Sequence, residues 1–123
     1  MKLLVTGTEG YIGSRLAPIL AHRGHEVVGF DTGFYRDGWL YSDGAQLAAT
    51  PRTVIKDLRN IDASDLEGFD GVVHLAELSN DPLGENRPEV TYQINHQGSL
   101  ELARLAKAAG VRRFVYASSC SVY

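Results

Sequence analysis

Short apolar runs rich in β-branched and aromatic residues recur along the chain and predict five β-strands. The runs lie at 3–5, 27–30, 53–55, 72–75 and 114–116. A parallel strand is covered by helices on both faces, so its sequence is apolar almost throughout instead of alternating between apolar and polar residues. The pattern therefore favours a parallel sheet.

Two segments between these runs have apolar residues at helical spacing. In the first, residues 12–20, the apolar positions recur every three or four residues, and Gly24 follows as a stop signal. Pro18 lies inside this segment. Because a proline in a helix interior forfeits a backbone hydrogen bond, we expect a kink there.

The second helical segment is predicted over residues 87–109, with Asn86 starting it, Pro88 in its first turn and Gly110 ending it. This helix is roughly 34 Å long and the fourth strand only about 20 Å. If their lower ends are flush, Asn95 lies level with the carboxyl ends of the strands, where open α/β sheets bind ligands. Asn95 is then either a ligand contact or a helix asparagine satisfied by neighbouring loop backbone.

The alternation of strands and helices predicts an α/β protein with a Rossmann-type three-layer fold. We expect one domain over residues 1–123, with a parallel sheet of about five strands in the order 3-2-1-4-5. The fifth strand is then an edge strand whose backbone can pair with another chain. A homodimer is therefore left open.

Composition and charge narrow the function classes. The net charge of −3 argues against a nucleic-acid partner, and no apolar run is long enough to span a membrane or to form a signal peptide. The single cysteine, Cys120, has no partner for a disulfide, and the four histidines lack metal-ligand spacing. We expect a cytoplasmic protein that holds no metal and has neither a nucleic-acid nor a membrane partner.

The segment between the first strand and the first helix carries the strongest functional signal. Gly7, Gly10 and Gly13 follow one another at intervals of three residues. Gly7 lets the chain turn sharply, Gly10 leaves room for a pyrophosphate beside the backbone, and Gly13 permits close packing of helix and sheet. The helix then opens toward the phosphate charge, which places Tyr11 and Ile12 in the predicted cofactor site.

Asp31 adds an independent signal, because it ends the second strand 18 residues after Gly13. An acidic side chain at this place accepts hydrogen bonds from an adenosine ribose and repels a 2′-phosphate, which favours NAD over NADP. Arg36 is near enough in sequence to keep NADP open, and a solvated aspartate at a strand end is the alternative interpretation of Asp31.

The glycine pattern at 6–13 followed by Asp31 resembles the extended short-chain dehydrogenases/reductases, and specifically their NAD-dependent epimerase/dehydratase family. The resemblance extends over essentially the whole chain. It implies NAD as the cofactor and a nucleotide sugar as the substrate of the complete enzyme. It also implies that Asp57 holds the adenine ring together with the backbone amide of Leu58.

Further positions take their expected roles from the same resemblance. Leu75 and Ala76 match the end of the strand that lies along the nicotinamide side of the cofactor, and the next residue, Glu77, replaces the family's usual Ala or Gly. Asn95 resembles the first residue of the family's Asn-x-x-Gly. Residues 117–123 resemble its Ser-Ser-x-x-Val-Tyr segment, which places the active-site Ser/Thr at Ser119.

The family also implies a Tyr-x-x-x-Lys pair, in which the tyrosine is the general acid/base and the lysine lowers its pKa. Residues 1–123 contain no such pair. We therefore expect these residues to be the NAD(P)-binding domain without the substrate region, and to be catalytically inactive alone. The alternative hypothesis is a non-catalytic dinucleotide-binding or self-associating module.

Some residues are expected to serve packing instead of chemistry. His74 lies inside an apolar strand and is predicted to be a satisfied core histidine, and Cys120 is predicted to be a small packing residue. A group of aromatic residues after Asp31 is expected to form the lid of a small satellite core, and contact with adenine or with a partner is the alternative. Its members are Phe34, Tyr35, Trp39 and Tyr41.

Overall fold

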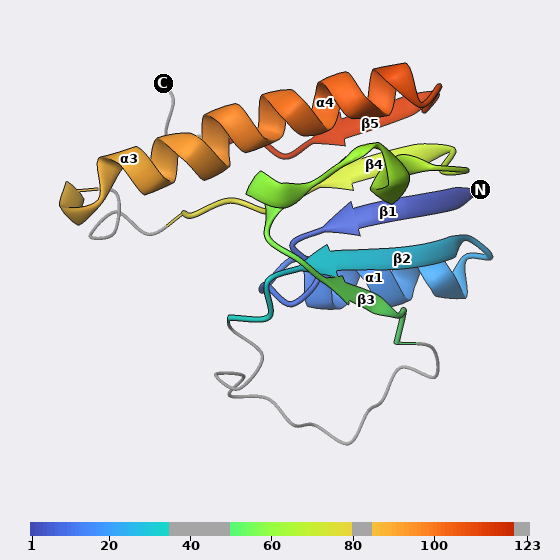
Figure 1. Cartoon of the computed structure of the whole chain (residues 1–123). Helices are drawn as coiled ribbons and strands as arrows, with labels where there is room; N and C mark the ends of the chain where they lie inside the picture. Colours follow the sequence, from blue (N-terminus) through green and yellow to red (C-terminus); the bar gives the residue numbers. More distant parts are fainter. Residues whose placement is uncertain (35–49, 80–84, 120–123) are drawn as a thin grey trace.

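A computed structural model of the chain describes residues 1–34, 50–79 and 85–119. In these ranges five parallel strands form one sheet with the order β3-β2-β1-β4-β5 (Figure 1). The strands are β1 (Lys2–Thr6), β2 (Glu26–Asp31), β3 (Thr53–Ile55), β4 (Gly71–His74) and β5 (Arg113–Tyr116). The predicted strands and their order are confirmed.

Helices cover both faces of the sheet, which makes the three layers of a Rossmann-type fold. Because neighbouring residues of a strand point to opposite faces, Leu4 and Val5 of β1 belong to different cores. One core joins strand side chains to the β3–β4 crossover and to helix α4 (Ser99–Ala108); it consists of Leu4, Phe30, Leu58, Ile61, Leu66, Val72, Leu102 and Ala106. The other joins β1 and β2 to helix α1 (Gly13–His22); it consists of Val5, Ala17 and Val27.

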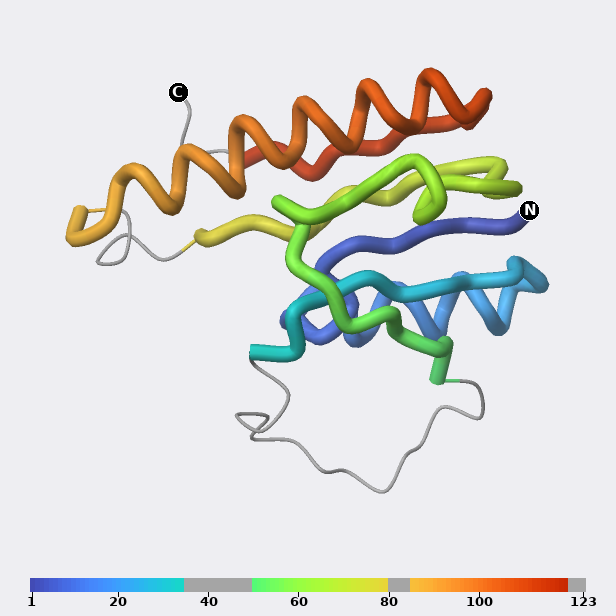
Figure 2. The backbone as a smooth tube through the Cα atoms, viewed as in Figure 1, coloured from blue at the N-terminus to red at the C-terminus, as the bar shows by residue number. Residues whose placement is uncertain are grey.

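The path of the backbone brings the carboxyl ends of the strands together. Figure 2 shows the amino terminus at one edge of the sheet, and the turn between β1 and α1 at the opposite edge. The chain segments after β2, β4 and β5 leave the sheet at that same edge. Side chains at these chain segments can therefore act on one ligand.

Helix α1 begins directly after the glycine turn and continues through Pro18, which is buried. Pro18 therefore lies inside the helix, as the sequence indicated; the kink stays a prediction. The helix ends at His22, and Gly24 follows with a φ of +86°.

The second predicted helix exists, but its start and its middle differ from the prediction. It begins as α3 (Pro88–Thr91) with Arg87 as its N-cap, so the assignment of Asn86 as the start is wrong. The physical reason is Pro88, since a proline forces the residue before it out of the helical region and thus fixes the boundary there. Between α3 and α4, the segment η4 (Tyr92–Gly98) is a π-helix, which the sequence analysis did not anticipate.

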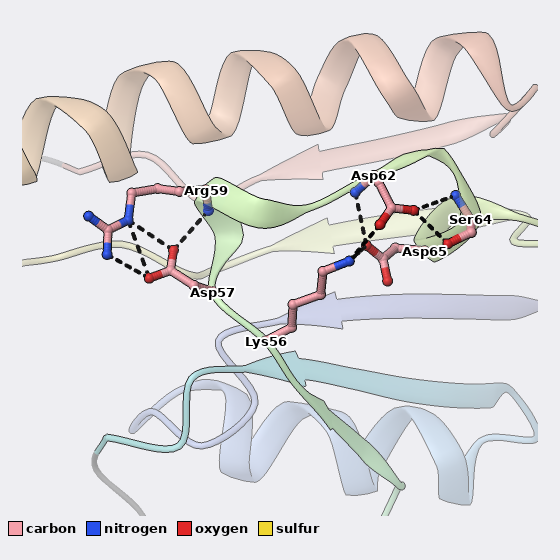
Figure 3. A network of polar contacts seen from close by, with 6 residues as sticks. All are labelled: Lys56, Asp57, Arg59, Asp62, Ser64 and Asp65. Carbon is pink, nitrogen blue, oxygen red and sulfur yellow. Dashed lines mark hydrogen bonds and ion pairs between the residues drawn. The ribbon is translucent and has the colours of Figure 1, made fainter.

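The crossover from β3 to β4 is held by charged side chains (Figure 3). It contains two short 3₁₀-helices, η2 (Leu58–Asn60) and η3 (Ala63–Leu66). The Lys56 ammonium group lies 2.7 Å from Asp62 and 2.6 Å from Asp65, and the hydrogen bonds from Lys56 and Ser64 lower the pKa of Asp62. These contacts join the residue after β3 to η3, while the apolar side chains of Leu58, Ile61 and Leu66 pack the crossover on the sheet.

Phe34 and strand β5 lie at the surface of the molecule. Phe34 is 75% exposed, so its predicted place in a satellite core is wrong; Tyr35, Trp39 and Tyr41 lie outside the described residues. All four residues of β5 are exposed, which fits the predicted edge strand. No helix within the described ranges is long and apolar enough to cross a membrane.

Candidate functional site

The glycine turn between β1 and α1 is closed so tightly that side chains are excluded from two of its positions. Gly7 has a φ of +76°, and a Cβ placed on it would lie 2.9 Å from the backbone nitrogen of Ala76. A Cβ on Gly13 would lie 2.0 Å from the carbonyl oxygen of Gly7. Gly13 therefore packs against the backbone of the turn itself. The sequence had instead indicated that Gly13 permits close packing of helix and sheet.

Gly10 is less tightly enclosed than the other two glycines. A Cβ there would meet only the carbonyl oxygen of Gly7, at 3.3 Å. The backbone of the turn is thus approachable at Gly10, as the binding of a pyrophosphate requires.

The backbone amides at the start of α1 are available to a ligand. No side chain caps the helix, and among the described residues the amides of Tyr11 and Ile12 have no acceptor. Both residues are largely exposed, with Tyr11 at 88% and Ile12 at 60%. Free N–H groups at a helix N-terminus, with the positive end of the helix dipole behind them, attract phosphate groups.

The carboxylate of Asp31 lies next to this turn and is held in place by backbone amides. Its Oδ2 accepts a hydrogen bond from the amide of Glu9 at 3.0 Å, and its Oδ1 accepts one from the amide of Gly33 at 2.8 Å. Asp31 and the glycine turn are therefore brought together at the carboxyl ends of β1 and β2. This is the arrangement in which a carboxylate reaches a ribose attached to a bound pyrophosphate.

A buried network centred on Thr6 ties the glycine turn to the end of β4. The Thr6 hydroxyl oxygen accepts hydrogen bonds from the amides of Leu75 at 3.1 Å and Ala76 at 3.2 Å. Both of its lone pairs are then used, so its proton points to Nδ1 of His74, at 2.6 Å. The backbone of Leu75 and Ala76 is thereby fixed against the turn.

His74 completes this network and is a satisfied core histidine, as predicted. Since its Nδ1 accepts from Thr6, its hydrogen is assigned to Nε2, which donates to the Ser99 hydroxyl at 2.7 Å. The ring is 1% exposed, and burial lowers the pKa of His74 to about 4. The sequence did not predict the hydrogen bonds of Thr6 and Ser99 to His74, because no spacing in the sequence links these residues to His74.

Asp57 and Leu58 stand at the start of the β3–β4 crossover and point in different directions. Figure 3 shows the Asp57 carboxylate held by Arg59, whose backbone amide and guanidinium both donate to it at 2.7–3.2 Å. The hydrogen bond from the Arg59 side chain is the main reason why the pKa of Asp57 is lowered. The side chain of Leu58 is buried close to Gly98 and therefore cannot contact a ligand.

Asn95 bonds the loop that follows β4 through both the oxygen and the nitrogen of its side-chain amide. Its Oδ1 accepts from the amide of Leu78 at 2.8 Å, and its Nδ2 donates to the Leu78 carbonyl at 2.9 Å. This is the second of the two interpretations that the sequence left open. The Ser99 hydroxyl bonds His74, the last residue of β4, so Ser99 is level with the carboxyl ends of the strands. Asn95 precedes Ser99 by four residues and therefore lies about one helical turn beyond these ends, whereas the estimate from element lengths placed it level with them.

We expect the substitution Asn95→Ala to lower the free energy of unfolding by about 2 kcal/mol, since it removes two hydrogen bonds to a half-buried backbone. Urea unfolding followed by circular dichroism measures the change. Gln93→Ala, in the same π-helix, is the control and is expected to change stability by less than about 0.5 kcal/mol. Equal stabilities of the two variants would contradict the role given to Asn95.

Ser119, the predicted active-site hydroxyl, is exposed and follows β5 at the same edge of the sheet. Its neighbour Cys120 and the candidate NADP contact Arg36 lie outside the described residues. Across the part of the chain that the structure describes, no three histidine, cysteine or acidic residues are placed to hold a metal ion.

A Rossmann-type sheet, an uncapped helix behind a glycine turn and a carboxylate at the end of β2 together define a dinucleotide-binding domain. Comparison with protein families agrees with this class. The model of the NAD dependent epimerase/dehydratase family matches residues 3–123. The chain belongs to this family, and it carries the family's NAD-binding part.

Two individual relatives illustrate the similarity of this chain to known proteins. A UDP-glucose 4-epimerase of Klebsiella pneumoniae is 37% identical over all of this chain and 92% of its own length. A UDP-glucose 4-epimerase of Streptomyces lividans is 38% identical over 99% of this chain and 37% of its own length. This chain thus spans nearly the whole length of the first of these relatives and about a third of the length of the second.

Two solved structures show the same fold with the cofactor in place. UDP-glucose-4-epimerase from Stenotrophomonas maltophila, with bound NAD and formylated UDP-arabinopyranose, has a TM-score of 0.83 and 30% identity. MoeE5 in complex with UDP-glucose and NAD has a TM-score of 0.82 and 30% identity. Each match covers 100% of this chain and 38% of the other.

Proposed function

We propose that the chain is the NAD-binding part of a nucleotide-sugar epimerase or dehydratase. The observation that carries the proposal is the free amides of Tyr11 and Ile12 beside the open backbone at Gly10, next to the carboxylate of Asp31. This combination fits a pyrophosphate followed by a ribose. Bound NAD supplies a hydride acceptor for a sugar carbon.

In this proposal, different groups of described residues bind different parts of NAD. The turn from Gly7 to Gly13 and the start of α1 bind the pyrophosphate, and Asp31 binds the adenosine ribose. Asp57, fixed by Arg59, and the backbone of Leu58 bind the adenine ring. Leu75 and Ala76, held by Thr6, line the nicotinamide side, and Asn95 positions the loop beyond them.

In the complete enzyme, Ser119 would orient the sugar hydroxyl from which a proton is removed. A hydroxyl at the carboxyl end of β5 can donate to or accept from a sugar oxygen there. The proton itself would be taken by the tyrosine of a Tyr-x-x-x-Lys pair, which the family resemblance implies and which residues 1–123 do not contain.

Partners and location follow from the same proposal. The substrate of the complete enzyme is a nucleotide sugar, because solved relatives are bound to UDP-sugars.

The exposed side chains of Phe114, Val115 and Tyr116 on edge strand β5 support a homodimer. The single cysteine supports a reducing compartment such as the cytoplasm.

The test is a calorimetric titration of the chain with NAD and with NADP. We expect binding of NAD, weaker binding of NADP, and a loss of about tenfold in NAD affinity in Asp31→Asn, since the carboxylate no longer accepts charge-assisted bonds from the ribose. The same variant is expected to reduce the preference for NAD over NADP, because the repulsion of a 2′-phosphate is removed.

Glu67→Gln is the matched control, since Glu67 is exposed, lies at the far side of the crossover and loses the same charge. It is expected to bind NAD as the unaltered chain does. No heat at millimolar NAD would refute the proposed function, and unchanged affinity in Asp31→Asn would refute the role of Asp31.

A further inference from the structure

A carboxylate and a phenol meet at the edge of the sheet where the strands end, and the proposed function assigns neither of them a role. The hydroxyl of Tyr116, the last residue of β5, donates a short hydrogen bond to Oε1 of Glu77. Glu77 lies three residues after the end of β4 and is partly buried. The bond to Glu77 raises the pKa of Tyr116, so the phenol stays protonated as the donor.

The charge of Glu77 is not neutralised within the described part of the chain. Tyr116 is the described residue that bonds the carboxylate, and no lysine or arginine described here forms an ion pair with it. A phenol orients a carboxylate without cancelling its charge. Glu77 therefore keeps a negative charge that can attract a cationic group bound close to it.

The topology tells which part of a dinucleotide lies there. In this sheet order a dinucleotide crosses the carboxyl ends at the switch between β1 and β4, with one nucleotide on each side. Asp31, after β2, marks the adenosine side. The turn at Gly7 lies against Leu75 and Ala76, so Glu77 follows directly on the other side, where the nicotinamide half belongs.

We propose that Glu77, oriented by Tyr116, makes this site selective for the oxidised cofactor, NAD⁺, over NADH. The inference rests on the proposed function. The oxidised nicotinamide ring carries a positive charge and the reduced ring is neutral, so a nearby carboxylate attracts only the first. A neutral side chain at this position would lack such a charge, so the selectivity depends on the acid at Glu77.

The experiment compares the dissociation constants of NAD⁺ and NADH, measured by calorimetry, for the unaltered chain and for Glu77→Gln. Glutamine keeps an oxygen that accepts from Tyr116 but removes the charge. We expect the variant to bind NAD⁺ about fivefold more weakly and NADH with unchanged affinity. The ratio of the two constants is insensitive to a general loss of folded protein.

Glu26→Gln is the matched control, because Glu26 starts β2 at the opposite edge of the sheet and its loss changes the net charge equally. Its ratio is expected to equal that of the unaltered chain. A ratio unchanged in Glu77→Gln, with both nucleotides bound, overturns the selectivity and leaves the proposed function intact. Failure of the unaltered chain to bind either nucleotide overturns both.

Discussion

Replacement of Gly13 by alanine is expected to lower the free energy of unfolding by about 4 kcal/mol and to abolish NAD binding. The added Cβ would lie 2.0 Å from the carbonyl oxygen of Gly7 and 2.7 Å from the Cα of Thr8. Both are backbone atoms of a turn that is fixed against β4, so neither can move aside. Urea unfolding and NAD titration measure the two effects.

Two other glycines provide controls of different kinds. Gly24→Ala introduces a Cβ at a φ of +86°, but nothing lies within 4 Å, so only the backbone strain remains and a cost of about 1 kcal/mol is expected. Gly10→Ala is expected to keep the fold and to weaken NAD binding, because its Cβ would stand where the pyrophosphate approaches. If Gly13→Ala were as stable as Gly24→Ala, the closed turn described above would be wrong.

Acidification is expected to destabilise the chain through His74. The folded protein holds the pKa of His74 at about 4, below its ordinary value of 6.5. Between these values the unfolded chain takes up a proton and the folded chain does not, so the free energy of unfolding falls as the pH falls. We expect a loss of about 2 kcal/mol between pH 7.5 and pH 5, measured by urea unfolding.

His74→Gln is expected to remove this dependence, whatever its own stability at neutral pH. His22→Gln is the matched control, since His22 is exposed at the end of α1, and it is expected to keep the full dependence. The aspartates whose pKa is lowered, Asp57, Asp62 and Asp70, contribute only at more acidic pH. An unaltered slope in His74→Gln would show that another group is responsible.

The strands and the glycine turn were predictable from the sequence because local rules determine them. Continuous apolar runs indicate buried parallel strands, and Gly13 is required by contacts within the turn itself, whereas Gly7 is also required by the backbone at the end of β4. Asp31 was also predictable, since it ends a strand that the pattern already showed.

The contacts that link distant parts of the chain were not predictable in this way. Thr6 and His74 are 68 positions apart, and their hydrogen bond depends on the register in which β1 and β4 pair. The position of Asn95 was misjudged because the estimate assumed flush ends, and η4 was missed because a π-helix has no distinctive composition.

The wide turns of η4 have a consequence for length variation in this helix. A π-helical segment accommodates one residue more than an α-helix does over the same rise. Deletion of a single residue between Tyr92 and Gly98 would therefore leave an uninterrupted α-helix with little rotation of its amino-terminal part, because the wide turns already absorb the extra residue. Related chains can thus differ by one residue in this segment while α3 and α4 keep nearly the same rotation about the helix axis.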